Sequence, residues 1–357
     1  GDVYKRQVPL LTTTQVAALT TSQVQFLTST QLNVFESQDL QALTSTQVRN
    51  LTTDQVTNLS ADQFALLTTR QVSVLTTDQI GVLGDSALAA LTTTQAQVLT
   101  TAQIRALSTT QLNALETEDL QALTSGQISG LSSDQLNALD TSYLQVLTTS
   151  QVRGIQVGQL SGLSTSQVQA LTSSQVEALS ATQIKALSSD QLNALESEDL
   201  QALTSDQLRI LSTAQVSALT TTQIQNLASA QVPSLSATQV KALSSDQLNA
   251  MESEDWQALT STQIQALTLT QVPTLSTTQI QALSTSQITS LTANQIKALT
   301  TEQFNALEVD DMGALTSTQL RALTTEQLAS LSTSAANYLT TTQISQLSAT
   351  QQRALPA

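Results

Sequence analysis

The sequence predicts an all-α fold, a solenoid of very short capped helices with one helix in each eight-residue repeat. Three observations support this prediction. The phrase Leu-Thr/Ser-x-x-Gln-Val/Ile/Leu-x-Ala, here called an octad, runs through the chain, and a clean copy is Leu179–Ala186. Each octad carries the signals that start a helix. Neither one long helix nor a plain strand fits a period of eight.

The octad register is unbroken from Leu11 to Leu355, without a single insertion or deletion. In the Leu register only Phe35, Ile155 and Met251 replace Leu, and all three are large and apolar. The Gln register has 43 positions, of which 35 are Gln and eight are Asp39, Ala87, Asp119, Tyr143, Asp199, Asp255, Asp311 and Ala335. Self-similarity at a fixed period is typical of repeat proteins.

Within an octad, Thr or Ser is expected at the N-cap, where its hydroxyl accepts from a free backbone N–H. Gln, three residues later, is expected to reach back to the N-cap amide and complete a capping box. Leu before the cap and Val, Ile or Leu at the fourth helical position form a hydrophobic staple. The octad therefore indicates one helical turn to one and a half turns, followed by a bend.

The spacing excludes the simpler alternatives. Eight residues at about 100° each move the Leu stripe about 80° around a long helix per octad, so no face could stay buried. Alternation in a strand would place Leu11 and Val16 on opposite faces. A single helical turn is unstable alone, so the octads must stack on one another. The number of octads per superhelical turn and the handedness stay open at this point.

A parallel β-solenoid is the alternative fold, because Thr, Val and Ile favour strands. Pro233 and Pro273 also stand at the fifth helical position, where a helix interior rejects proline. Against the β-solenoid, Gly and Asn are scarce for coil corners, whereas Ala and Gln are frequent. We therefore expect helices that end near these prolines.

Charges follow the same register. Acids gather just before Gln, and bases follow the Val/Ile/Leu position, as a helix dipole prefers. The basic register is expected to face water, and its members are Arg49, Arg105, Arg153, Lys185, Arg209, Lys241, Lys297, Arg321 and Arg353. The chain of 357 residues has a net charge of −15, only 2% aromatic residues, and neither His nor Cys. A thin aliphatic core needs few aromatic side chains.

Five acidic octads are the only candidate sites. Their hard oxygen ligands suit Ca²⁺, but they lack the glycine and the Asp/Asn spacing of a calcium loop. The alternative interpretation is a variant helix cap favoured by the dipole. The candidate residues are Glu36/Asp39, Glu116/Glu118/Asp119, Glu196/Glu198/Asp199, Glu252/Glu254/Asp255 and Glu308/Asp310/Asp311.

No catalytic, cofactor-binding or metal residue is assigned, and no cofactor is expected. Paired carboxylates can perform acid–base chemistry, but here they recur along a regular surface without a partner nucleophile. Hydroxyls without His form no ordinary triad. Trp256, Tyr143, Tyr338 and Phe304 are expected as variants of regular octad residues. Twelve bases against 27 acids argue against nucleic-acid binding, and no apolar run is long enough to span a membrane.

A higher-order repeat is superimposed on the octads. Gln183–Leu203, Gln239–Leu259 and Gln295–Leu315 are near-copies, each shifted by 56 residues or seven octads. The acidic octads at Glu36 and Glu116 are 80 residues, or ten octads, apart. Because seven and ten disagree, duplication of blocks is favoured over a fixed structural period.

Residues 1–6 stand outside the pattern and form a non-repeat tail. Asp2–Gln7 resembles a translated sequencing-adaptor scar, and the alternative is a short natural tail. Residues 7–357 are expected to form one continuous octad solenoid, a segment of a longer array. The sequence shows no signal-peptide core.

Residues 7–357 resemble the Leu-Thr/Ser-x-x-Gln-Val/Ile-x-Ala octad arrays of large bacterial surface proteins, often labelled haem utilisation or adhesion proteins. The resemblance implies export and an extracellular or cell-surface location, with host or matrix components as partners. Haem ligation is not expected, because only Met and Tyr could bind the iron.

We expect a non-enzymatic, adhesin-like structural region that acts as a stalk, spacer or display scaffold. Two alternatives are a binding module, whose exposed face or acidic octads hold Ca²⁺, a glycan or a protein, and a disordered low-complexity linker.

Overall fold

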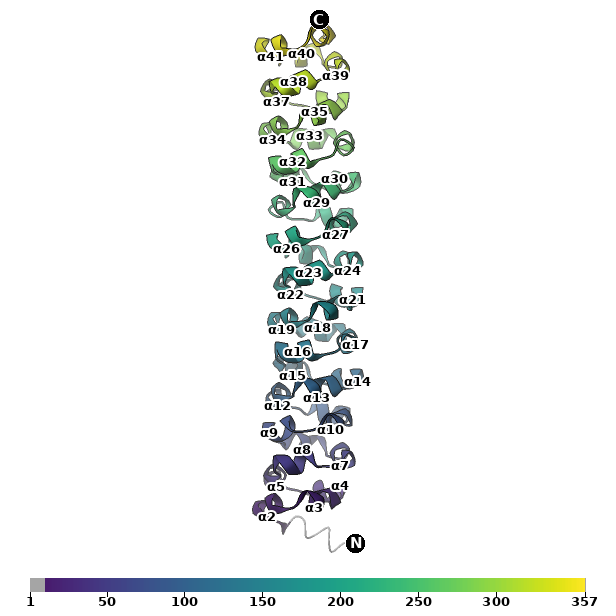
Figure 1. The fold of residues 1–357 in the computed structure, drawn as a ribbon, viewed down its shortest axis with the longest axis vertical. Coiled ribbons are helices and arrows are strands. Elements are labelled where there is room, and N and C mark those ends of the chain that lie inside the picture. Colours follow the sequence, from purple (N-terminus) through teal and green to yellow (C-terminus); the bar gives the residue numbers. More distant parts are fainter. Residues whose placement is uncertain (1–9, 357) are drawn as a thin grey trace. The chain divides into compact units, whose positions relative to one another are not determined.

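The computed structural model describes residues 10–356 and divides them between two compact units, Gly1–Ala186 and Leu187–Ala357. Within each unit the chain winds through a stack of short helices, coloured from purple to teal and from teal to yellow (Figure 1). The described residues contain no strand. The all-α prediction is therefore confirmed, and both the β-solenoid and the disordered linker are wrong for this part of the chain. The tail at residues 1–6 lies outside the described residues.

The helices are four to six residues long and follow one another at the octad interval. Those of the first unit are Thr13–Ala18 (α2), Thr21–Phe26 (α3), Ser29–Leu32 (α4), Ser37–Ala42 (α5), Ser45–Arg49 (α6), Thr53–Thr57 (α7), Ala61–Leu66 (α8), Thr69–Ser73 (α9), Thr77–Gly81 (α10), Asp85–Ala89 (α11), Thr93–Val98 (α12), Thr101–Ala106 (α13), Thr109–Leu112 (α14), Thr117–Ala122 (α15), Ser125–Gly130 (α16), Ser133–Asn137 (α17), Thr141–Val146 (α18), Thr149–Gly154 (α19), Val157–Leu160 (α20), Thr165–Gln169 (α21), Ser173–Ala178 (α22) and Ala181–Ala186 (α23).

The second unit continues the same series, with two 3-10 helices (η) among its α-helices. Its helices are Ser189–Asn193 (α24), Ser197–Gln201 (α25), Ser205–Ile210 (α26), Thr213–Ala218 (α27), Thr221–Gln225 (α28), Val232–Ser234 (η2), Ala237–Ala242 (α29), Ser245–Ala250 (α30), Ser253–Ala258 (α31), Ser261–Ala266 (α32), Val272–Thr274 (η3), Thr277–Ala282 (α33), Thr285–Ser290 (α34), Ala293–Ala298 (α35), Thr301–Asn305 (α36), Val309–Ala314 (α37), Ser317–Ala322 (α38), Thr325–Ala329 (α39), Thr333–Ala336 (α40), Thr341–Gln346 (α41) and Ala349–Ala354 (α42).

Each helix begins as the octad predicts. In α13, the Thr100 hydroxyl accepts from the backbone N–H of Gln103 at 3.2 Å, and the Thr100 N–H donates to Gln103 Oε1 at 2.7 Å. This is the expected capping box, with Gln at the third helical position, N3. The helix ends at Leu107, whose backbone turns to the extended region (φ −66°, ψ 137°). The same Leu then precedes the next N-cap, Ser108.

The two interior prolines change the type of helix without breaking the register. Pro233 and Pro273 lie in η2 and η3, the 3-10 turns that replace the α-helix in their octads. Proline lacks the N–H that an α-helix would use at this position. A tighter turn avoids the missing bond, so the expected conflict is resolved locally.

The core of each unit is a thin double row of aliphatic side chains. Leu at the bend and Val, Ile or Leu at the fourth helical position, N4, are buried in nearly every described octad, as Leu219 and Ile224 illustrate. These are the two positions of the predicted staple. The basic register is exposed throughout, for example at Arg105 and Lys241, which confirms that prediction.

Helices pack against the helix that starts three octads later, as α12 does with α15 and α35 with α38. Gln side chains reach further, to the end of the helix four octads earlier, as Gln103 of α13 does to α9. One superhelical turn within a unit therefore takes between three and four octads. This quantity could not be read from the sequence.

Candidate functional site

A ladder of buried glutamine amides joins successive turns of each unit. Besides accepting from its own N-cap, Gln103 donates through Nε2 to Val72 O at 2.9 Å and Leu75 O at 2.8 Å, 31 and 28 residues earlier. Gln103 is 2% exposed. One side chain thus caps its own helix and satisfies two carbonyls of the preceding turn. Backbone carbonyls at a bend otherwise lack donors, and burying them unpaired is costly.

The same bonds recur along both units, and the sequence analysis missed them. Capping explained Gln without its amide, because the amide's partners lie about 30 residues away. Tyr143, one of the exceptions in this register, supports the role, since its hydroxyl donates to Asn113 O at 2.8 Å, 30 residues earlier. A different side chain therefore supplies the missing donor.

In the acidic octads, Asp takes the place of Gln and is buried, whereas the flanking Glu or Asp residues are exposed. The carboxylate accepts from the turn below instead of donating to it. Thr285 Oγ1 donates to Asp311 Oδ1 at 2.8 Å, and the Ser229 hydroxyl donates to Asp255 in the same way, 26 residues earlier. An ionised carboxylate is an acceptor only, so the bond has reversed direction.

The acidic octads of the second unit lie in one column. Gln231 donates to Leu200 O of α25 at 3.0 Å, and Ser229 of the same octad bonds to Asp255 of α31. Gln287 of α34 then donates to Trp256 O of α31 at 2.7 Å, and α34 packs on α37. The 56-residue repeat is therefore two turns.

The acidic octads of the first unit are linked in the same manner over three turns. Gln71 of α9 donates to Leu40 O of α5 at 2.9 Å. Helix α9 packs on α12, which packs on α15. Seven octads and ten octads are thus both whole numbers of turns. The disagreement between these intervals, used above against a structural period, disappears.

Two of the buried carboxyls have a raised pKa. Burial, followed by the charges of Glu116 and Glu118, raises the pKa of Asp119 to about 6. Burial also raises the pKa of Asp255, although its hydrogen bonds with Ser229 and Glu252 act in the opposite direction. The charged form loses hydration in both cases.

The acidic side chains do not converge on a metal-binding geometry. Over residues 10–356, no group of three or more His, Cys, Asp or Glu residues is close enough to hold a metal ion. Each acidic octad directs one carboxyl inward and the others to solvent, as Asp255 and Glu254 illustrate. The calcium alternative thus gains no support from this geometry.

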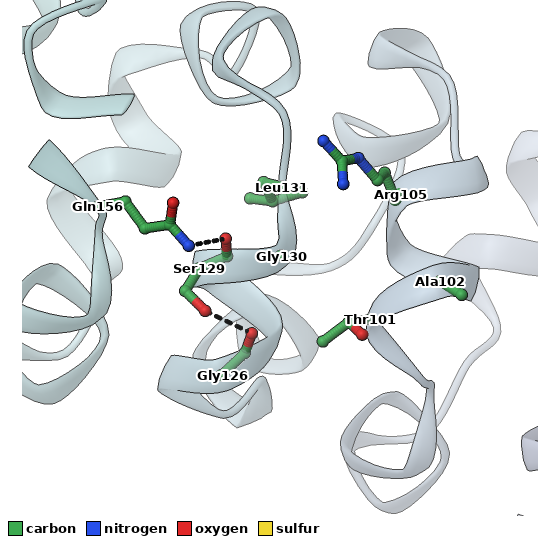
Figure 2. Close-up of a pocket in the computed structure, with 8 residues that line it drawn as sticks. All are labelled: Thr101, Ala102, Arg105, Gly126, Ser129, Gly130, Leu131 and Gln156. Carbon is green, nitrogen blue, oxygen red and sulfur yellow. Dashed lines mark hydrogen bonds between the residues drawn. The ribbon is translucent and has the colours of Figure 1, made fainter. Parts of the chain in front are cut away.

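A surface hollow of about 510 Å³ lies between α13 and α16 and is bounded by Gln156, the N-cap of α20. Figure 2 shows the exposed Arg105 and Gln156 on either side of it. Gln156 Nε2 donates to Ser129 O at 3.2 Å, and Ser129 Oγ donates to Gly126 O at 2.9 Å. No carboxylate lines this hollow.

Similar hollows recur between other turns. Each is formed by the end of one helix, the Leu-Thr bend and the helix three octads away, and each includes one basic side chain without a carboxylate. The basic residues are Lys241, Arg70 and Arg49. The predicted exposed register therefore lines a repeated surface feature.

The aromatic exceptions are mostly core residues, as expected. Trp256 and Phe304 are fully buried at N4, whereas Tyr338 is 38% exposed. The Trp256 indole N–H is buried and has no hydrogen-bond acceptor in the described part of the chain. None of the described helices is long and apolar enough to cross a bilayer.

A family model described as the ALTTAQ repeat matches seven segments, which together cover more than half of the chain. Comparison with curated proteins gives no match. Five matched segments begin four residues before the N-cap Glu of an acidic octad, so that octad has a fixed place in the repeat. The segments are 32–69, 112–149, 192–229, 248–285, 275–309, 304–341 and 312–349.

Proposed function

The chain belongs to the ALTTAQ repeat family, and from its ladder of coil-to-coil bonds we propose that it is a non-enzymatic structural scaffold. Each octad bonds only with octads three or four positions away within its unit, as Gln263 does with Val232 and Leu235. A repeat that contacts only near neighbours can be lengthened without redesign. This is the property that a stalk, spacer or display region requires.

Small-angle X-ray scattering tests the scaffold proposal. A compact domain of this length would have a radius of gyration of about 21 Å. Turns of helices stack about 8–10 Å apart, so an extended array should exceed about 30 Å. A value near the compact estimate would contradict the spacer role.

We propose a bacterial cell-surface or secreted location for the scaffold, as part of an adhesin-like protein. The likeness of the octads to those of large surface proteins supports this location. Sequencing the gene on both sides of this region provides the test. An export signal with adhesive terminal domains is expected, whereas a cytoplasmic enzyme in the same reading frame would contradict it.

The recurring hollows favour a second candidate function, binding of a glycan or protein partner along the array. Arg105, Thr101 and Gln156 offer a cation, a hydroxyl and an amide around one hollow. Glycan-array screening of wild type and Arg105→Ala tests this function. Selective binding that weakens in the variant is expected, and equal or absent binding would exclude this hollow.

A further inference from the structure

We propose that Asp119 makes the seam between α15 and the turn below it sensitive to mild acid. When ionised, its carboxyl cannot donate to that turn. When protonated, it regains the donor that glutamine supplies elsewhere in the ladder.

The position of Asp119 in the ladder carries the proposal. Above it, Gln151 donates to Leu120 O at 2.7 Å and to Leu123 O at 2.8 Å, so α15 is tied to the following turn. Below it, the residues 31 and 28 positions earlier are Leu88 and Leu91, whose carbonyls occupy the matching acceptor places. Asp119 is 3% exposed, and within residues 10–356 its side chain forms no hydrogen bond.

An ionised carboxylate and a backbone carbonyl are both acceptors, so they repel each other in a buried seam. Asp311 avoids this problem through the 2.8 Å bond from the Thr285 hydroxyl. Thr93 holds the matching place for Asp119 but is exposed and forms no such bond in the described structure. Asp119 is therefore the less compensated of these two carboxyls.

The charged surroundings also favour proton uptake. Glu116 and Glu118 lie on the same octad as Asp119. Of the helices that pack on α15, α12 has no titratable side chain, and α18 contributes Tyr143 and its cap Asp140. The neighbours four octads away add Asp85 on α11 and Arg153 on α19. Acids predominate around the seam, consistent with the pKa of about 6 at Asp119.

The direction of the effect follows from proton binding. The folded chain holds a proton on Asp119 up to about pH 6, whereas the unfolded chain releases it near the ordinary pKa of 3.8. Between these values the folded state binds more protons, so stability falls as pH rises. The seam is therefore weakest at neutral pH and strengthens on acidification.

Thermal unfolding of the full chain from pH 4.5 to 7.5 tests the proposal with Asp119→Gln, which restores the octad consensus. The wild type should melt close to the variant at acid pH and clearly below it at neutral pH. Asp134→Asn, at an exposed acid of the same unit, should follow the wild-type profile. A difference between wild type and Asp119→Gln that does not change with pH would overturn the proposal.

Carbon-13 NMR of the Asp carboxyls gives a second readout that does not depend on melting. Asp119 should titrate about two pH units above Asp134, in line with its raised pKa. Amide hydrogen exchange around Asp119, corrected for intrinsic rates, should slow several-fold between pH 7 and pH 5 in the wild type only. Titration of Asp119 together with Asp134 would refute the mechanism.

Discussion

The Nε2 amide of Gln263 donates to the backbone carbonyl of Val232 at 2.8 Å, although 31 residues separate them in the chain. The Oε1 atom of the same side chain accepts from the Thr260 N–H at 2.7 Å. Local capping and long-range stacking are therefore performed by one residue. Since the repeat renews this residue every eight positions, helix initiation and assembly of the solenoid are coupled.

The face assignment predicts unequal effects from two nearby substitutions in α29 and the bend that follows it. Leu243→Asp places an unpaired charge at a 4% exposed position and should cost at least about 3 kcal/mol of unfolding free energy. Lys241→Ala, at an exposed position, should change stability by less than about 0.5 kcal/mol. Urea unfolding followed by circular dichroism measures both, and similar losses would contradict the assignment.

Two glycines of neighbouring helices should respond in opposite ways to alanine. At Gly154 an added Cβ would lie 2.8 Å from both Cβ and the carbonyl oxygen of Ser125, so the backbone must shift. We expect Gly154→Ala to destabilise the chain by about 1–2 kcal/mol. At Gly158 nothing lies within 4 Å, so alanine should be neutral or stabilising by up to about 1 kcal/mol. Equal melting temperatures would count against this close approach.

The buried indole of Trp256 should tolerate removal of its N–H. The Nε1 atom has no acceptor among the described residues, and an unsatisfied buried donor costs about 1–3 kcal/mol. Trp256→Phe should therefore leave stability unchanged or raise it, because less packing is lost than polar cost removed. Trp256→Ala should cost about 3–5 kcal/mol through the cavity it leaves. A large loss in the Phe variant would reveal an acceptor for the indole.

Most of the fold could be predicted from local sequence. Thr100 and Gln103 lie three residues apart, and capping depends on that spacing alone. The core positions and the exposed bases follow from the same register. The 3-10 turns at Pro233 and Pro273 could be located but not identified, because the sequence shows the missing donor and not the geometry that replaces it.

The arrangement of the turns could not be predicted, because it depends on contacts about 30 residues apart. Gln103 was interpreted as a cap, but its bonds to Val72 and Leu75 required the number of octads per turn. The acidic octads were identified by residue, whereas their alignment in a column was obscured by the unequal intervals. One signal was available: Tyr143, in the Gln register, retains a donor that can reach the turn below.

The most direct test of the ladder is the unfolding free energy of Gln263→Glu compared with Gln265→Glu at pH 7.5. The first variant keeps the shape and the cap acceptor but removes the donor to Val232 and Leu235, whereas exposed Gln265 forms a single bond with Ser290 O at 3.0 Å. We predict a loss of about 3 kcal/mol or more for Gln263→Glu and less than about 1 kcal/mol for Gln265→Glu. Equal losses would contradict the claim that buried glutamine amides hold the turns together.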